Sequence, residues 1–403
     1  MANNNNTKNL NVPTLRFPEF TGEWKLVQLS QIADFVGGGT PSSSNASFWN
    51  GSIPWISSSD IKDGNIYDIS ITRFITKEAI DKSTTKLCPA PVILLVSRVG
   101  VGKVALSNKK LCTSQDFCNL INIKCNPNFL AYDLVRTMKQ KSREAQGTSI
   151  KGVTSYEIQK IRFWLPEKKK EQDKIATFLS LLDHRIATQN KIIEDLKKLK
   201  SAISKHLFAR KDLLETTICL SNIATLKNGY AFQSGKYNAL GKWKILTITN
   251  VSGERYINDE DYNCIINLPN DIQDHQVLKE GDILISLTGN VGRVSLCKDG
   301  DYLLNQRVGL LQLAKNVNQE FLYQILSSQR FENSMIACGQ GAAQMNIGKG
   351  DVESYVLPYS SNVNNILLVA KILHSYDEYI INEQRKLTLL TMQKQYFLAQ
   401  MFI

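Results

Sequence analysis

The stretch PVILLVSRVGVGKVAL at residues 91–106 decides how the rest of the chain is interpreted. Its GVGK segment suggests a phosphate-binding loop, but such a loop needs a glycine, four further residues, Gly-Lys and then Ser or Thr. Ser97 stands where the first glycine is required, and Val104 follows Lys103. A second stretch, GDILISLTGNVGRVSL at residues 281–296, repeats the same design and explains it better.

The two stretches align residue by residue and predict two equivalent β-hairpins. The matched positions are Ile93 with Ile283, Leu94 with Leu284, Gly102 with Gly292, Val104 with Val294 and Leu106 with Leu296. In each copy an apolar strand enters, a glycine-containing turn reverses the chain, and a second strand begins beside a cation, Lys103 or Arg293. A similarity at a fixed long offset indicates an internal duplication.

The same offset relates most of the chain. LSQIADF at 29–35 matches LSNIATL at 220–226, QGTSIKGV at 146–153 matches QGAAQMNI at 340–347, and the segment 175–208 matches 369–402. Each copy is too long for a solenoid repeat, so two similar domains are the simpler interpretation. The predicted parts are a tail and entry segment at 1–25, a first globular domain at 26–166, a central helix at 167–212, a second globular domain at 213–360 and a C-terminal helix at 361–403.

Both helical segments carry a narrow apolar seam at heptad spacing, which is typical of helices that pair with another helix. The proposed pairing residues are Leu179, Leu182, Ile186, Ile193 and Leu196 in the first segment, and Leu373, Tyr376, Ile380, Leu387 and Leu390 in the second. We expect the helices to pair with each other in antiparallel orientation, giving an α+β chain in which two mixed α/β domains are joined and spaced by a coiled coil with pseudo-twofold repeat. The alternative is that each helix packs only on its own domain.

Composition limits the class of protein. The 403 residues are 43% hydrophobic, which is enough for two cores, and no apolar run reaches the roughly 18 residues that span a bilayer, so a cytoplasmic protein is expected. Eight cysteines without a C-x-x-C pair and four histidines predict buried reduced thiols and no metal site. A net charge of +11 indicates a polyanionic partner.

The order of the parts, together with the entry segment VPTLRFPEFTGEWKLVQLSQIADF at 12–35, resembles the specificity subunit of type I restriction-modification systems over essentially the whole chain. The resemblance implies a non-catalytic subunit that reads double-stranded DNA. Each recognition domain would contact one half of an asymmetric, interrupted site, while the helices would fix the gap and dock two methyltransferase subunits. Restriction subunits would complete the nuclease, and the methyl donor, ATP and Mg would belong to those partners, so no cofactor is expected here.

DNA readout uses Arg or Lys for guanine and Asn or Gln for adenine, and phosphates are held by cations, hydroxyls and backbone amides. The candidates in the first domain are Gly38, Gly39, Thr40, Ser58, Ser59, Lys62, Arg98, Lys103, Gln115, Gln146, Thr148 and Lys151. The candidates in the second domain are Asn228, Tyr230, Thr249, Asn250, Thr288, Asn290, Arg293, Asn305, Gln306, Arg307, Gln340 and Gln344. Each could instead be an ordinary turn residue. The pairs Lys103/Arg293 and Gln146/Gln340 are favoured because both copies place the same chemistry there.

Two other classes compete with this interpretation. NPNF at 126–129 resembles the Asn-Pro-Pro-aromatic motif of adenine methyltransferases, although Asn128 replaces the second proline and no glycine-rich methyl-donor turn precedes it. An E-x-K at Glu167 and Lys169 lacks an acidic partner for a nuclease site. A coiled-coil scaffold without a DNA role would explain the helices but not two basic, loop-rich copies.

Overall fold

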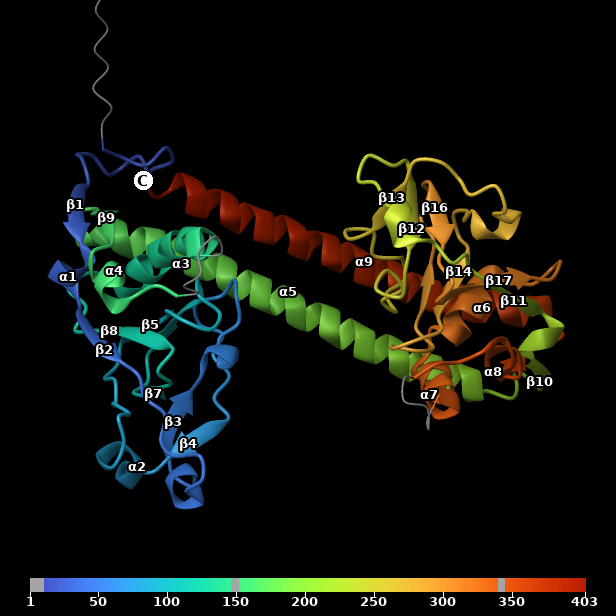
Figure 1. Ribbon diagram of the computed structural model, residues 1–403, viewed down its shortest axis with the longest axis horizontal. Coiled ribbons are helices and arrows are strands. Elements are labelled where there is room, and N and C mark those ends of the chain that lie inside the picture. The colour runs from blue at the N-terminus through green and yellow to red at the C-terminus, as the bar shows by residue number, and fades with distance from the viewer. Residues whose placement is uncertain (1–10, 146–151, 340–344) are drawn as a thin grey trace, which may run out of the picture. The chain divides into compact units, whose positions relative to one another are not determined.

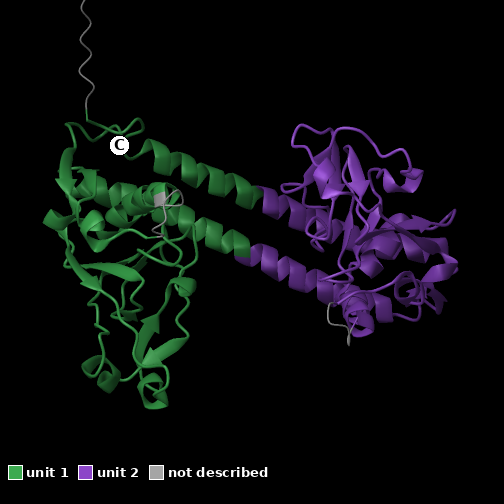
Figure 2. Cartoon of the chain, in the orientation of Figure 1, with its two compact units in different colours: residues 1–190, 386–403 green, residues 191–385 purple. Residues whose placement is uncertain are grey.

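The chain divides into two units, which are coloured separately in Figure 2. Unit 1 comprises residues 1–190 and 386–403, and unit 2 comprises residues 191–385. The computed structural model describes residues 11–145, 152–339 and 345–403. Each unit therefore contains one globular part and one segment of each long helix (Figure 1).

Unit 1 is built on two small sheets with one further strand pair. The first sheet has the order β2-β8-β5-β6, the second has the order β4-β3-β7, and β1 pairs with β9. The strands are β1 (Lys25–Gln28), β2 (Asp34–Gly37), β3 (Ile53–Ile56), β4 (Arg73–Ile75), β5 (Val92–Val96), β6 (Val104–Ser107), β7 (Cys112–Thr113), β8 (Phe117–Ile121) and β9 (Arg162–Leu165). All pairs are antiparallel except β3 with β7, which is parallel.

Unit 2 repeats this topology strand for strand. Its sheets have the orders β11-β17-β14-β15 and β13-β12-β16, and β10 pairs with β18. The strands are β10 (Thr216–Cys219), β11 (Ala224–Asn228), β12 (Trp243–Leu246), β13 (Asn263–Ile265), β14 (Ile283–Ser286), β15 (Val294–Leu296), β16 (Tyr302–Leu304), β17 (Val308–Leu313) and β18 (Val356–Tyr359). Here too one pair, β12 with β16, is parallel. The internal duplication is confirmed.

The hairpins predicted from the opening stretch are confirmed in the same register. Ile93 lies opposite Leu106 in the first hairpin, and Ile283 lies opposite Leu296 in the second. Gly102 and Gly292 have positive φ values of 108° and 76°, and a side chain there would press on α3 and α7, respectively. Glycine is therefore needed for backbone geometry and for close helix packing.

The long apolar run of β5 is explained by burial on both faces. Ile93 and Leu95 pack into the core shared with the helices of unit 1, whereas Val92, Leu94 and Val96 pack into a second core toward β3 and β7. β14 is divided in the same way between two cores of unit 2. A strand covered on both faces needs no polar alternation.

The shorter helices cover the sheets and connect the strands. They are α1 (Leu29–Ile32), α2 (Lys77–Asp81), α3 (Pro127–Ala145) and α4 (Ser155–Gln159) in unit 1, and α6 (Gln319–Leu326), α7 (Gln329–Gly339) and α8 (Lys349–Glu353) in unit 2; 3-10 turns lie at Ala46–Trp49, Ser58–Asp60, Leu220–Asn222, Ser234–Lys236 and Asp274–Gln276. α3 and α6 begin alike, because Asn126 and Asn318 each accept a hydrogen bond from the amide three residues later.

The two long helices are α5 (Lys169–Ala209) and α9 (Val363–Gln400), and they run antiparallel within each unit. In unit 1, Phe178 of α5 contacts Phe397 of α9. Asp183 lies five residues after Phe178 and pairs with Lys394, which lies three residues before Phe397. In unit 2, Lys200 pairs with Asp377, while Lys197 and Gln384 both bond to Glu254. The predicted antiparallel pairing is confirmed.

The proposed pairing residues also serve the globular cores. Leu179, Leu182, Ile193, Leu373 and Ile380 are buried, and the other five proposed residues are partly buried. Leu179 and Leu182 belong to the core of unit 1, and Leu373 belongs to a core of unit 2. Each helix therefore pairs with the other and packs on a globular part, so the two alternatives are not exclusive.

The cysteines are reduced, as predicted, but not all are buried. Cys219 is partly buried and Cys338 is exposed, whereas the others are buried. Burial raises the pKa of Cys88 to about 11 and that of Cys297 to about 12, which keeps these thiols protonated and unreactive. Among the helices in the described part of the chain, none combines the length and apolarity required to cross a membrane.

Candidate nucleic-acid interface

Four loops that are far apart in the sequence meet in unit 1, at residues 37–40, 57–60, 97–98 and 114–116; we call them loop cluster 1. Three backbone hydrogen bonds hold them together: Gly39 N to Thr113 O (2.8 Å), Ser114 N to Ile56 O (2.9 Å) and Ser97 N to Asp116 O (2.8 Å). Each loop follows or precedes a buried strand. The sheet edge therefore positions all four loops.

The same four loops meet in unit 2, at residues 228–230, 247–250, 287–290 and 305–307; we call them loop cluster 2. The equivalent bonds run from Tyr230 N to Leu304 O (2.8 Å), from Asn305 N to Leu246 O (3.2 Å) and from Leu287 N to Arg307 O (3.0 Å). These bonds make Gln115 equivalent to Gln306 and Asp116 equivalent to Arg307. These four candidate loops in each unit, all within the described residues, thus converge on two matching clusters.

A glycine lets the first and last loops of each cluster cross. A Cβ atom on Gly38 would lie 1.9 Å from Ser114 O, and one on Gly229 would lie 2.1 Å from Asn305 O. Neither carbonyl can move freely, because each belongs to a loop fixed by the bonds above. These two glycines build the clusters by allowing close backbone approach.

The second loop of each cluster is a hydroxyl-lined turn, and the side chain of its last residue closes the turn. Asp60 accepts the amide of Ser57 at 2.7 Å, and Asn250 accepts the amide of Thr247 at the same distance. In both turns the first hydroxyl bonds to the hydroxyl two residues on, Ser59 or Thr249, at 2.8 Å. Ser59 and Thr249 are exposed.

Two predicted residues of these turns are better explained by structure than by DNA contact. Asn250 is 2% exposed, and its amide group donates to the carbonyls of Asn258 and Asp261. Ser58 is buried as well. Because the side chains of Ser58 in unit 1 and Asn250 in unit 2 are buried, neither residue is among the DNA contacts that we propose.

Exposed amide side chains mark the fourth loop of each cluster. Gln115 and Gln306 are both exposed. Thr40 donates a hydrogen bond to the Gln115 carboxamide oxygen, and the Gln306 backbone amide donates to Tyr230 O. Tyr230 in turn donates to Asp271, which raises the pKa of Tyr230.

The favoured cation pair turns out to have internal partners. The Lys103 ammonium donates to Ser58 O and Ile61 O at 3.1 and 2.9 Å and so supports the hydroxyl-lined turn. Arg293 lies 3.5 Å from Glu332. The sequence could not show these partners, because they lie on other loops and on a helix.

The remaining candidates differ in the solvent exposure of their side chains. Arg98, Asn228, Asn290 and Arg307 are exposed, and Lys62 is exposed beside Asp68. Thr288 and Asn305 are partly buried, and Asn305 accepts the amide of Arg307. Five candidates lie outside the described residues: Gln146, Thr148, Lys151, Gln340 and Gln344.

The motifs of the rival interpretations have structural tasks. Asn126 of NPNF caps α3 and also bonds to Asp173 at 2.7 Å, so its amide is not free to hold an extruded adenine. Glu167 pairs with Lys25. Within residues 11–145, 152–339 and 345–403, no group of three His, Cys, Asp or Glu side chains could hold a metal ion.

The fold defines a class of proteins in which a duplicated α+β domain is carried on paired helices, and comparison with known proteins identifies the family. The model of the type I restriction modification DNA specificity domain matches residues 21–198 and again 215–392. These two ranges cover most of the chain, so the chain belongs to this family and is a specificity subunit of a type I restriction-modification system.

Relatives from one archaeon and a solved structure agree with this. The MjaIX specificity subunit of Methanocaldococcus jannaschii is 33% identical over 193 residues, which span 46% of this chain and 44% of the relative. The MjaVIII specificity subunit of the same organism is 25% identical over 350 residues, covering 80% and 78% of the two chains. The S subunit of a type I system from M. genitalium shares the fold, with a TM-score of 0.57 at 17% identity over 97% of this chain and 99% of that one.

Proposed function

We propose that the chain recognises an asymmetric, interrupted site in double-stranded DNA, one half through loop cluster 1 and the other through loop cluster 2. One observation supports this above all. The same backbone hydrogen bonds join the four loops in both units, but the exposed side chains on these loops differ between the units. Equal frameworks would approach DNA in the same way, and different side chains would select different bases.

Roles for individual residues follow from their chemistry. Gln115 and Gln306 carry carboxamides, which suit the donor and acceptor pattern of adenine in the major groove. Arg307 suits guanine or a phosphate, and Ser59 and Thr249 offer hydroxyls to either. Gly38, Gly229, Asn250 and Lys103 hold the loops of the clusters in place and would not contact DNA themselves.

The subunit would be a reader and not an enzyme. The methyl donor, ATP and Mg would bind to partner subunits, which would carry the chemistry. The engagement of Asn126 at the start of α3 supports this, as does the naming of the relatives as specificity subunits.

The exposed faces of the long helices would dock two methyltransferase subunits, and restriction subunits would join that complex. On α9, Leu389, Met392 and Tyr396 are 64, 61 and 57% exposed and follow one another at helical spacing. Exposed apolar side chains gathered on one helix face mark a protein contact. The two helices would also keep the half-sites at a fixed gap.

Co-expression with the cognate methyltransferase subunit, followed by genome-wide mapping of methylated adenines, tests the proposal. We expect one split motif with a fixed gap. Gln306→Ala should relax one half of this motif and Gln115→Ala the other, each at about 1–3 kcal/mol of base discrimination. Gln395→Ala removes an exposed glutamine from α9 and should change neither half. Methylation at a short continuous site, or none with a folded complex, would contradict the proposal.

A further inference from the structure

Buried polar groups lie where the long helices meet the globular part of each unit. In unit 1, Asp183 of α5 pairs with Lys394 of α9 and accepts the Tyr132 hydroxyl of α3 at 2.7 Å, while Lys394 also donates to Gly64 O. We call these four residues hub 1. The side chains of Asp183 and Lys394 are 1% and 7% exposed.

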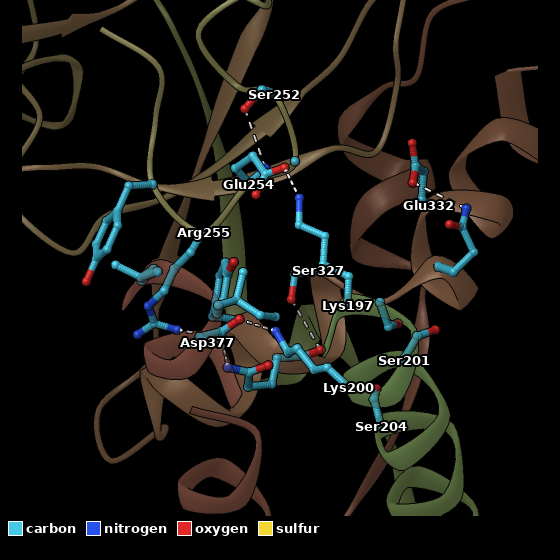
Figure 3. Close-up of a pocket in the computed structure, with 18 of the residues that line it drawn as sticks. Lys197, Lys200, Ser201, Ser204, Ser252, Glu254, Arg255, Ser327, Glu332 and Asp377 are labelled. Atoms are coloured by element: carbon cyan, nitrogen blue, oxygen red, sulfur yellow. Dashed lines mark hydrogen bonds and ion pairs between the residues drawn. The ribbon is translucent and has the colours of Figure 1, made fainter. Parts of the chain in front are cut away.

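Unit 2 contains an equivalent but richer group, hub 2, formed by Lys200, Arg255, Glu320, Gln324 and Asp377. Asp377 lies between Lys200 at 2.5 Å and Arg255 at 3.0 Å and accepts the Gln324 amide at 2.6 Å. Figure 3 shows Lys200 and Arg255 pointing toward Asp377 from two sides, at the wall of a cavity of about 1410 Å³. Burial alone would lower the pKa of Arg255, but its pairs with Glu320 and Asp377 outweigh burial and raise it.

The two hubs are related by the internal duplication. Asp183 and Lys200 of α5 stand at the same interval as Asp377 and Lys394 of α9. Each helix therefore gives its aspartate to one hub and its lysine to the other. An antiparallel alignment satisfies both ion pairs at once.

The apolar seam by itself does not select this alignment. A heptad pattern stays in phase when one helix slides by seven residues, so neighbouring alignments would bury similar side chains. Such a slide would set Leu387 or Met401 opposite Asp183, and Ala370 or Gln384 opposite Lys200. Asp183 of hub 1 would then stay buried without its ionic partner, and Lys200 of hub 2, which is only partly exposed, would lose its carboxylate.

We infer that the two hubs fix the alignment of α5 against α9, and that this alignment sets the gap length the subunit accepts between half-sites. A buried ion pair contributes little net stability compared with apolar packing, whereas a mispaired buried charge is strongly unfavourable. Such pairs therefore act mainly by excluding wrong alignments, as polar residues do in coiled-coil seams. The hubs also tie the aligned helices to the globular parts, through Tyr132 and Gly64 in unit 1 and through Gln324 and Arg255 in unit 2.

Nitroxide distances on the free, full-length subunit test the alignment. Labels are placed at Ala187→Cys on α5 and Gln393→Cys on α9, both exposed positions of unit 1, after replacing Cys219 and Cys338 by serine. We expect one narrow distance in the parent. Asp183→Lys should broaden the distribution and add a second component, because a slide by seven residues moves one helix about 10 Å along the other.

The charge swap Asp183→Lys with Lys394→Asp should restore the parent distance, and Glu194→Lys, an exposed reversal on α5, should leave it unchanged. An unaltered distribution in a stably folded Asp183→Lys protein would overturn the inference. If Asp183→Lys fails to fold, the double variant Asp183→Lys with Lys394→Asp is used instead. A folded double variant with the parent distance supports the inference, and a double variant that is unfolded or has a different distance overturns it.

The DNA consequence rests on the proposed function and has its own readout. The parent should prefer one gap length by at least about tenfold over gaps one base pair shorter or longer, and Asp183→Lys should lose this preference while keeping both half-site sequences. A gap preference that survives in Asp183→Lys would overturn the link to the gap. If the parent binds no site specifically, the proposed function fails, while the nitroxide distances still decide the alignment.

Discussion

The two units share their framework and differ in the side chains that they expose. Sheet orders, the glycine crossing and the hydroxyl-lined turn are the same in both. At equivalent positions, however, unit 1 has Asp116 where unit 2 has Arg307, and unit 1 has Gly39 where unit 2 has Tyr230. The comparison shows that duplication preserved the parts that position the loops, while the exposed chemistry diverged. A subunit of this kind is suited to an asymmetric site.

The largest expected effect concerns the hubs, and it should be unequal. Asp183→Ala should destabilise unit 1 by about 3–5 kcal/mol, because Lys394 would stay buried without a carboxylate. Asp377→Ala should cost less, because Arg255 keeps Glu320 and Lys200 is 17% exposed. Urea unfolding followed by tryptophan fluorescence reports mainly unit 1, and hydrogen exchange reports unit 2. Equal losses in both units would contradict the difference between the hubs.

The second prediction is that the stability of unit 1 depends on pH through a buried carboxylate that unit 2 lacks at the equivalent position. Burial raises the pKa of Asp133 to about 6, although Arg136 opposes this, and Asp133 Oδ2 has no hydrogen-bond partner among the described residues. The equivalent residue of α6 is Ile325. Because the folded pKa lies above the ordinary value of 3.8, the stability contribution of Asp133 is complete below that pH and is lost as pH rises through about 6.

Asp133→Asn should therefore stabilise unit 1 at pH 7 by about 3 kcal/mol and make no difference below pH 4. Stability curves of the two proteins from pH 4 to 8, measured by urea unfolding, give the comparison. Parallel curves would show that the buried carboxylate is not linked to folding.

The charge difference between the loop clusters gives a third prediction. Arg307→Asp copies the residue type of Asp116 into unit 2 and should weaken DNA binding by about 1–2 kcal/mol, with a salt dependence reduced by about one phosphate contact. Asp116→Asn in unit 1 should have little effect on salt dependence. Binding titrations at several salt concentrations measure both. If the affinity of the parent and that of Arg307→Asp depend on salt concentration with the same slope, Arg307 does not contact a phosphate of the DNA.

The smallest expected effect is at Arg293. Its contact with Glu332 leaves less of its charge for DNA, so Arg293→Ala should weaken binding by less than about 0.5 kcal/mol. Lys103→Ala should do more, because it removes the support of the turn at Ser58 and Ile61. Direct binding measurements compare the two. A large loss for Arg293 with none for Lys103 would reverse this assignment.

Much of the fold could be predicted because the duplication supplies two versions of each element. Ile93 with Leu106 and Ile283 with Leu296 repeat one hairpin, and the heptad seams repeat one helix. The convergence of four loops could not be predicted, since it depends on one parallel strand pair in each unit, β3 with β7 and β12 with β16. The burial of Asn250 and the partners of Lys103 depend on the same tertiary contacts.

The hubs escaped prediction although the sequence holds a signal for them. Asp183 matches Asp377, and Lys200 matches Lys394, within segments that are otherwise apolar along one seam. Charged residues that recur at such positions in both copies are typical of buried ion pairs. Pairing across helices could not be assigned until the antiparallel alignment was known.

Selection of DNA sites by the intact complex, for the parent and for a chain carrying Asn305→Ser with Arg307→Asp, tests the central claim most directly. These changes give loop cluster 2 the side chains of loop cluster 1 at the fourth loop. We predict that one half of the selected site changes while the other half and the gap stay the same. A change in both halves, or an unchanged site at undiminished affinity, would contradict the claim that each unit reads its own half.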